Sequence, residues 1–205
     1  MQSYDVKKAR RDLYAPTPGV VEIVDVPETG FLMVDGRGDP NTAPAYREAV
    51  HALYATSYAI RAVAKTALER VHTVAPLEGL WSAEDWSVFR SRDKDAWDWT
   101  LMIAQPDWIT PALVEDARAA AQRKQLPALG LLRFERFAEG RSVQLLHVGR
   151  YDDEGPALAR LHDEFLPAHG LAPVGRHHEI YLSDARRVEP ARLRTVLRQP
   201  VAAVT

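Results

Sequence analysis

The feature of this sequence that most restricts its fold is an internal repeat. A predicted β-hairpin, a break containing Gly and Asp, an amphipathic helix and a closing strand occur twice in the same order. The first copy spans residues 20–108 and the second spans 129–201, with a connecting helix expected at 110–124. A duplication of this kind predicts two similar structural units built from the same elements.

The first copy begins with a predicted hairpin. Apolar residues alternate with others from Val20 to Val26, Pro27-Glu-Thr-Gly30 has the composition of a turn, and a second apolar run covers 31–35. Apolar residues at alternating steps of four and three then predict a long amphipathic helix from about 44 to 71. A strand with a period of two is expected at 97–103.

The second copy repeats this order. Strands at 129–137 and 142–148 form the predicted hairpin, a helix follows at 154–168, and a strand covers 177–183. The acidic run 152–154 is interpreted as a cap of that helix rather than as a carboxylate metal cluster. A short helix is expected at 190–197. Alignment of the two copies places Trp99 opposite Glu179.

Together these elements predict the α+β class. We expect a pseudo-twofold duplication of a βαββ-type module, with a mainly antiparallel sheet, helices on one face and a ligand groove between the halves. Residues 1–19 are polar and basic, and they are predicted to form an N-terminal arm outside the core. Residues 20–205 are predicted to be a single domain.

Composition excludes several classes of function. A net charge of −2 argues against direct binding of nucleic acid. The longest uncharged run has twelve residues, Ala49 to Ile60, which is too short to span a membrane. The absence of cysteine fits a cytoplasmic protein. His177 and His178 would point to opposite faces of a strand, so no metal site is expected. The segment from Gly36 to Asn41 lacks the third glycine of a dinucleotide-binding loop, and no cofactor is expected.

Two features suggest a ligand site. All five tryptophans lie between Trp81 and Trp108, and an aromatic cluster suits flat or cationic ligands. Trp99 and Trp81 are predicted to face the ligand, whereas Trp86 and Trp108 are interpreted as local packing. Glu179 lies within a strand among aromatic and apolar neighbours, where a carboxylate needs either a salt bridge to an arginine or a functional role.

Four segments carry a resemblance to a known family. The chain resembles the GyrI-like small-molecule-binding proteins from about Val20 to Val201, in the segments 31–41 (FLMVDGRGDPN), 105–107 (QPD), 146–154 (LHVGRYDDE) and 177–184 (HHEIYLSD). The resemblance implies paired βαββ-type modules with a ligand groove, and it places the family's groove glutamate at Glu179. Ser82, after Trp81, and Arg150 depart from the common pattern, and Ser82 would alter the shape of the groove.

The resemblance leaves two functions open, and in both the partner is a small molecule. Some relatives are cyclopropanoid cyclopropyl hydrolases, which open the cyclopropane of DNA-alkylating antibiotics, and this enzymatic reading is the one we favour. Others sense lipophilic cations without chemistry. The enzyme hypothesis assigns catalysis to Glu179, which would activate a water molecule. The predicted ligand-binding residues are Trp99, Trp81, Tyr181, Tyr151, His147, Tyr58 and Met102. The expected assembly is a monomer or a homodimer.

Overall fold

The structure is a computed structural model that describes residues 3–85, 88, 91 and 93–204. Trp86 lies outside these residues. The chain forms two compact units: unit 1 comprises Met1–Ala9 and Thr29–Phe137, and unit 2 comprises Arg10–Glu28 and Ala138–Thr205. Each unit contains an antiparallel sheet and helices, which confirms the predicted α+β class.

Unit 1 is built on a sheet with the strand order β5-β6-β3-β7. Its strands are β3 (Thr29–Arg37), β5 (Leu77–Ser82), β6 (Asp98–Gln105) and β7 (Arg133–Phe137), and all neighbours are antiparallel. Two short 3₁₀ helices cover Lys94–Ala96 and Pro127–Leu131.

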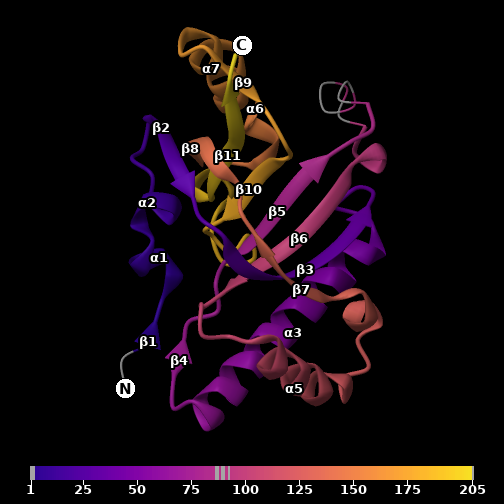
Figure 1. Ribbon diagram of the computed structural model, residues 1–205. Helices are drawn as coiled ribbons and strands as arrows, with labels where there is room; N and C mark the ends of the chain where they lie inside the picture. Colours follow the sequence, from indigo (N-terminus) through magenta and orange to yellow (C-terminus); the bar gives the residue numbers. More distant parts are fainter. Residues whose placement is uncertain (1–2, 86–87, 89–90, 92, 205) are drawn as a thin grey trace. The chain divides into compact units, whose positions relative to one another are not determined.

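The predicted long helix of unit 1 is confirmed as α3 (Pro44–Ala67). Its small and apolar face, which includes Ala49, Leu53 and Ile60, is buried and packs against β3 and β6. The expected connecting helix is α5 (Pro111–Gln122), where the Thr110 side chain accepts a hydrogen bond from the backbone N–H of Leu113. α5 lies beside α3 (Figure 1).

Unit 2 has the strand order β2-β8-β11-β10, with β9 paired to β11. The strands are β2 (Val21–Val26), β8 (Gly140–Val148), β9 (Leu171–Pro173), β10 (His177–Tyr181) and β11 (Arg194–Ala203). A continuous helical run follows β8, after a 3₁₀ turn at Tyr151–Asp153. It consists of α6 (Gly155–Ala159), a π-helical segment (Arg160–Phe165) and α7 (Leu166–Ala168).

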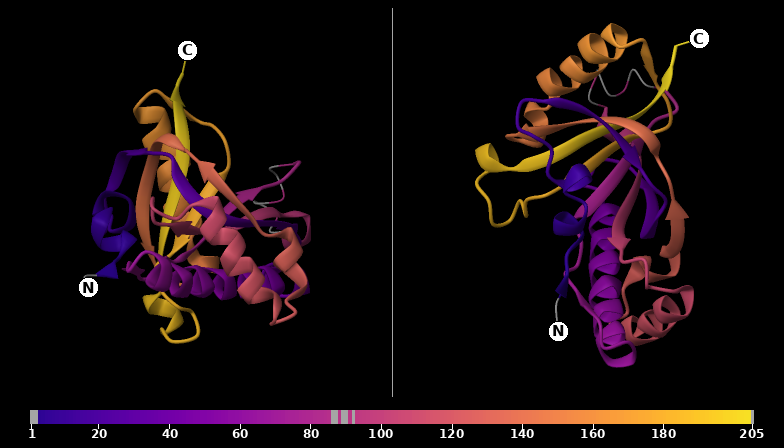
Figure 2. Two further views of the ribbon diagram at one scale, coloured as in Figure 1. Left: turned by 60° about the horizontal axis from the view of Figure 1, so that its bottom comes forward. Right: turned by 60° about the vertical axis from the view of Figure 1, so that its left-hand side comes forward.

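The helical run of unit 2 covers one face of its sheet (Figure 2). Leu161 and Leu166 from the helical run pack with Val143, Leu145 and Leu197 from the strands. The predicted acidic cap is wrong in its detail. Glu154 is the N-cap residue of α6, but no side-chain hydrogen bond caps this helix.

The N-terminal segment contributes to both units. β1 (Ser3–Tyr4) pairs in parallel with β4 (Val71–His72) in unit 1, and two short helices follow, α1 (Val6–Ala9) and α2 (Arg11–Tyr14). Leu13 and Tyr14 are buried. The prediction that this segment lies outside the core is wrong for these two residues, because Leu13 is held by a hydrogen bond from Arg198 to its backbone carbonyl.

Both predicted hairpins are wrong in their pairing, although their strands exist. β2 pairs with β8 in unit 2, whereas β3 pairs with β7 in unit 1. β3 is already paired with β6 on its other edge, so neither edge of β3 is open to β2. A turn-like sequence between two strands favours a local hairpin, but it does not determine which edges become available in the folded sheet.

The helix predicted at 190–197 is also wrong. Only Pro190–Arg192 forms a 3₁₀ turn, and the chain continues as β11, which lies between β8 and β10. A short apolar run with β-branched residues such as Thr195 and Val196 suits a strand that is buried on both faces, and periodicity alone does not separate it from a helix.

The additional strand changes the alignment of the two copies. By position in each sheet, β5 corresponds to β10 and β6 corresponds to β11. Trp99 lies in β6, whose counterpart is β11, whereas Glu179 lies in β10. The predicted equivalence of Trp99 and Glu179 is therefore wrong.

No helix among the described residues combines the length and the apolar character that crossing a membrane requires.

Candidate functional site

Glu179 lies in β10, on the sheet face of unit 2 that the helical run covers. Its Cα partner in β11 is Leu197, whose partner in β8 is Leu145, and both leucines belong to the core beneath the helices. Directly opposed residues of antiparallel strands share a face. Ile180 points to the other face and is fully buried. Burial alternates along the strand accordingly: His178 and Ile180 are buried, whereas His177, Glu179 and Tyr181 are half-buried.

The carboxylate of Glu179 has two neighbours on its own strand. The Tyr181 hydroxyl donates a hydrogen bond of 2.8 Å to Oε2, and Nε2 of His177 lies 3.8 Å from Oε1. The Glu179 side chain is 16% exposed, so the group is largely withdrawn from bulk water. A carboxylate oriented by a neighbouring hydroxyl has the geometry of a general base or of an anchor for a cation.

Of the other predicted residues of unit 2, Tyr151 contacts Tyr181, and His147 lies two strands away from it, across β11. The ring of Tyr151 meets the ring of Tyr181 edge-on, with 5.5 Å between centroids. His147 and Tyr181 are both Cα partners of Thr195, on either side of β11. Nε2 of His147 lies 3.0 Å from the Arg150 carbonyl oxygen, and since a carbonyl can only accept, this nitrogen carries the proton.

Two histidines that were not among the predicted site residues belong to the same group. His162, in the π-helical segment, lies 6.2 Å from His177 between ring centroids. Burial, together with the nearby His162 and His178, lowers the pKa of His177 to about 3, so this ring is neutral at physiological pH. The alternation of residues 177, 179 and 181 along one strand face indicated His177 in the sequence, whereas nothing there indicated His162.

The opposite face of the same strand carries a buried ion network. Glu139 Oε2 lies 2.8 Å from His178 Nδ1 and 3.1 Å from Arg198 Nη1, and the same arginine donates hydrogen bonds to Gln144. Burial alone would raise the pKa of Glu139, but the charges and hydrogen bonds of His178 and Arg198 lower it to about 2. This network fixes β10 from behind while Glu179 points the other way.

Trp99 and Trp81 occur together in unit 1. Tyr46 of α3 stacks on Trp81 at 6.4 Å and meets Trp99 edge-on at 5.3 Å between centroids. The Trp99 indole N–H donates to the Gly38 carbonyl, and a Cβ atom at Gly36 would overlap the Trp99 ring. These contacts give Trp99 a packing role. The ligand contact of both tryptophans stays a prediction.

The other predicted ligand residues of unit 1 are not brought to Trp99. Met102 lies in β6 with the opposite parity to Trp99, so the two side chains point to different faces of the sheet, and Met102 is fully buried. Tyr58 is 58% exposed on α3. Trp108, interpreted as local packing, contacts Tyr4 and Arg70.

Within residues 3–85, 88, 91 and 93–204, no group of three or more His, Asp or Glu side chains is arranged to hold a metal ion.

Comparisons with solved structures show close relatives. An uncharacterized conserved protein from Listeria innocua is 38% identical, with a TM-score of 0.89, and the match covers 98% of this chain and 100% of that one. A hydrolase encoded by lin2189 of the same organism is 36% identical, with a TM-score of 0.87 and the same coverage. The C-terminal domain of EcmrR shares the fold at 14% identity and a TM-score of 0.56, over 90% of this chain and 98% of that one.

Searches of sequence give the family. No curated protein matches the chain. The model of the GyrI-like small molecule binding domain matches residues 20–202, which is nearly the whole chain. With the duplicated α+β units and the relatives at 36–38% identity, this match shows that the protein belongs to the GyrI-like small molecule binding domain family.

Proposed function

We propose that this protein is a hydrolase that opens the strained cyclopropane ring of planar, DNA-alkylating cyclopropanoid compounds and thereby protects against them. The observation that carries the proposal is the Glu179 carboxylate, which is largely withdrawn from water and accepts a hydrogen bond from Tyr181 at 2.8 Å. The relatives at 36% identity that are named hydrolases support an enzymatic role.

In the proposed reaction Glu179 is the general base. It takes a proton from a water molecule, whose oxygen forms a bond to the ring CH₂ while the carbon–carbon bond of the cyclopropane breaks. The electron pair of the broken bond moves to the conjugated carbonyl oxygen, which then receives the proton. A positioned base typically accelerates such a step by about 10²–10⁴-fold, and relief of ring strain supplies further driving force.

The neighbouring side chains have supporting roles in this proposal. Tyr151 lies next to Tyr181, and its hydroxyl is assigned to the substrate carbonyl on which negative charge develops. The Nε2–H of His147 is already bonded to the Arg150 carbonyl. His147 is therefore proposed to contact the ligand through its ring and not through this N–H.

The test is turnover with excess substrate. Wild-type protein is incubated with a molar excess of a cyclopropanoid, and mass spectrometry follows the product that has gained one water. Glu179→Gln is expected to abolish turnover while ligand binding, measured by calorimetry, is retained. Glu189→Gln, which changes an exposed glutamate of the same unit, is the matched control and should keep the wild-type rate. An unchanged rate in Glu179→Gln refutes the assignment.

A second candidate function is binding of lipophilic cations without chemistry. The arrangement that favours it is the same carboxylate beside the paired rings of Tyr151 and Tyr181, since a carboxylate with aromatic neighbours attracts cations. Under this alternative the cyclopropanoid is consumed stoichiometrically or not at all. Tetraphenylphosphonium would then bind the wild-type protein and bind Glu179→Gln more weakly.

A further inference from the structure

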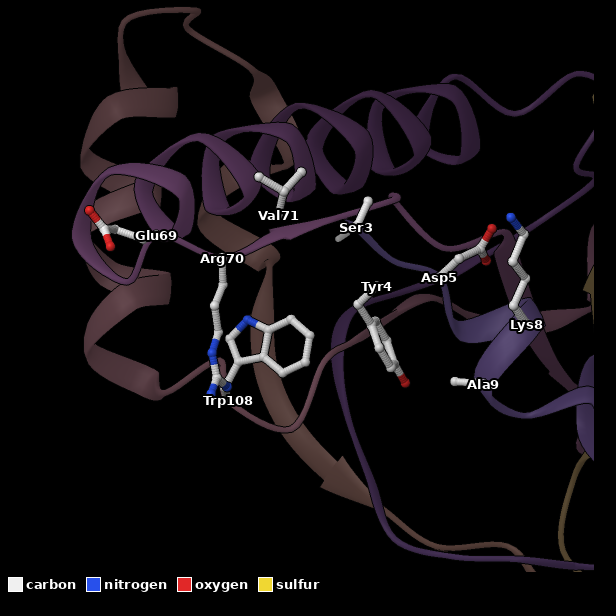
Figure 3. A pocket seen from close by; sticks show the side chains of 9 residues that line it. All are labelled: Ser3, Tyr4, Asp5, Lys8, Ala9, Glu69, Arg70, Val71 and Trp108. Atoms are coloured by element: carbon white, nitrogen blue, oxygen red, sulfur yellow. The ribbon is translucent and has the colours of Figure 1, made fainter. Parts of the chain in front are cut away.

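Unit 1 contains a pocket that includes none of the predicted site residues. It has a volume of about 470 Å³ and lies between the N-terminal segment Ser3–Ala9, the segment Glu69–Val71 and Trp108 (Figure 3). Sites for small molecules typically have volumes of about 300–1,000 Å³. The pocket is therefore large enough for a compact ligand.

Two backbone features build this pocket. The parallel pairing of Ser3 and Tyr4 with Val71 and His72, extended by a 2.8 Å hydrogen bond from Thr73 N–H to the Tyr4 carbonyl, fixes the N-terminal segment in place. Glu69 adopts a left-handed conformation with φ of 53°, which turns the chain between α3 and β4. Non-glycine residues rarely adopt this conformation, and here it sets the direction of the chain at Arg70, after α3 has ended at Ala67.

The pocket has an aromatic wall. The rings of Tyr4 and Trp108 meet edge-on at 5.0 Å between centroids, and the Arg70 guanidinium carbon lies 5.1 Å from the centroid of the Trp108 ring. Figure 3 shows Tyr4, Trp108 and Arg70 adjacent to one another. Such a wall offers flat apolar surface to an aromatic ring.

Arg70 is a cation of this pocket that makes no ion pair among the residues that the structure describes. In Figure 3 the carboxylate of Glu69 points away from Trp108, and Lys8 lies beyond Tyr4 at the other end of the pocket, beside the carboxylate of Asp5. A carboxylate or similar planar anion would complement Arg70, since the guanidinium fork binds such groups with two parallel hydrogen bonds.

We propose that this pocket is a binding site for a planar aromatic anion of the aryl carboxylate class. The ring of the ligand lies against Tyr4 and Trp108, and its carboxylate pairs with Arg70. This inference does not depend on the function proposed for Glu179, because every residue that it uses belongs to unit 1 and to this pocket.

The test is isothermal titration of the full-length protein with 2-naphthoate, and with 2-acetylnaphthalene as the uncharged analogue. Naphthoate is expected to bind with one site, and the neutral analogue at least about tenfold more weakly. Arg70→Gln should raise Kd about tenfold, the effect of losing one charged contact of about 1.4 kcal/mol. Arg70→Lys should recover part of the affinity, because it keeps the charge.

Two control variants make the result specific. Lys7→Gln removes a neighbouring cation that does not line the pocket, and Glu179→Gln alters the other candidate site, so both should bind naphthoate like the wild type. Each variant is checked for wild-type thermal unfolding, and if Arg70→Gln fails this check, the comparison of naphthoate with its neutral analogue on the wild-type protein decides. Absence of saturable binding to the wild type overturns the proposal. Equal affinity for the neutral analogue, an unchanged Kd in a folded Arg70→Gln variant, or loss of binding in Glu179→Gln does so too.

Discussion

Glu139 shows how a single buried charge depends on its partners. Its side chain is 2% exposed, and both Arg198 and His178 contact the same carboxylate oxygen. Removing one member of a buried ion group leaves the others uncompensated, which typically costs about 3–5 kcal/mol. Since His178 precedes Glu179 in β10, the stability of this network also bears on the position of the proposed base.

The lowered pKa of Glu139 predicts how stability changes with pH. The pKa falls from 4.5 to about 2 on folding, so the stabilisation is complete above pH 4.5 and is lost as the pH falls towards about 2. A shift of this size corresponds to about 3 kcal/mol. Glu139→Gln is therefore expected to lower the free energy of unfolding at pH 7 and to flatten its decline between pH 4.5 and 2, as measured by urea denaturation.

The matched control is a surface carboxylate with a similarly low pKa. Hydrogen bonds from Arg186 lower the pKa of Asp184 to about 2, but this side chain is 36% exposed and that of Arg186 is 84% exposed. Water screens such a pair, so Asp184→Asn should change stability by less than about 1 kcal/mol. An equal effect of the two substitutions would contradict the role given to the buried network.

At the scale of elements, the exchange of strand partners is the feature that most departs from sequence expectation. Asp25 and Arg141 are exposed Cα partners in the β2–β8 ladder, whereas a local hairpin would bring Glu22 opposite Asp35. The chain has no cysteine, so each pair can be replaced by two cysteines without a background of other thiols. Opposed Cα atoms of an antiparallel ladder lie about 4.5–5.5 Å apart, within the range of a disulfide.

The prediction for these strands is a selective cross-link. Asp25→Cys/Arg141→Cys should form an intramolecular disulfide on mild oxidation, visible as a shifted band on a non-reducing gel and as a linked peptide by mass spectrometry. Glu22→Cys/Asp35→Cys should remain reduced, because both edges of β3 are already paired. If Glu22→Cys/Asp35→Cys forms the disulfide and Asp25→Cys/Arg141→Cys does not, the strands pair as a local hairpin and the prediction is wrong.

At the scale of the whole molecule, the two units differ in how continuous the chain is that builds their sheets. Between Thr29 and Phe137, unit 1 is one uninterrupted stretch that contains all four strands of its sheet and both long helices. Unit 2 is assembled from two separate stretches, Arg10–Glu28 and Ala138–Thr205. If the units were 20–108 and 129–201, as expected from the sequence, β2 in the first unit would be separated from its partner β8 in the second. In the same way β7 in the second unit would be separated from its partner β3 in the first.

A fragment comparison tests this organisation. The fragment 29–137 is expected to unfold cooperatively by circular dichroism. The fragment 29–131 lacks β7, and therefore it lacks the ion pair of 2.7 Å between Arg133 and Asp35 and leaves an edge of β3 open. An open strand edge favours aggregation, so this shorter fragment should aggregate or unfold without a clear transition. Similar cooperative unfolding of both would show that β7 is dispensable.

The sequence by itself determined what local chemistry controls. The periodicity of α3, the proline starts of α3 and α5, and the alternation that places Glu179 and Tyr181 on one face of β10 all depend on neighbours within a few residues. The same patterns occur in both copies of the repeat. This similarity predicts the duplication and the α+β class, because backbone propensity and binary pattern act locally.

The tertiary structure decided which strands pair and which polar atoms meet. The pairing of β2 with β8, the central position of β11, and the meeting of Glu139, from the turn before β8, with His178 and Arg198 all join residues far apart in the chain. The approach of His162 to His177 depends on how the helical run packs on the sheet. Such contacts are selected by the burial of a whole face at once, a property that no local stretch of sequence contains.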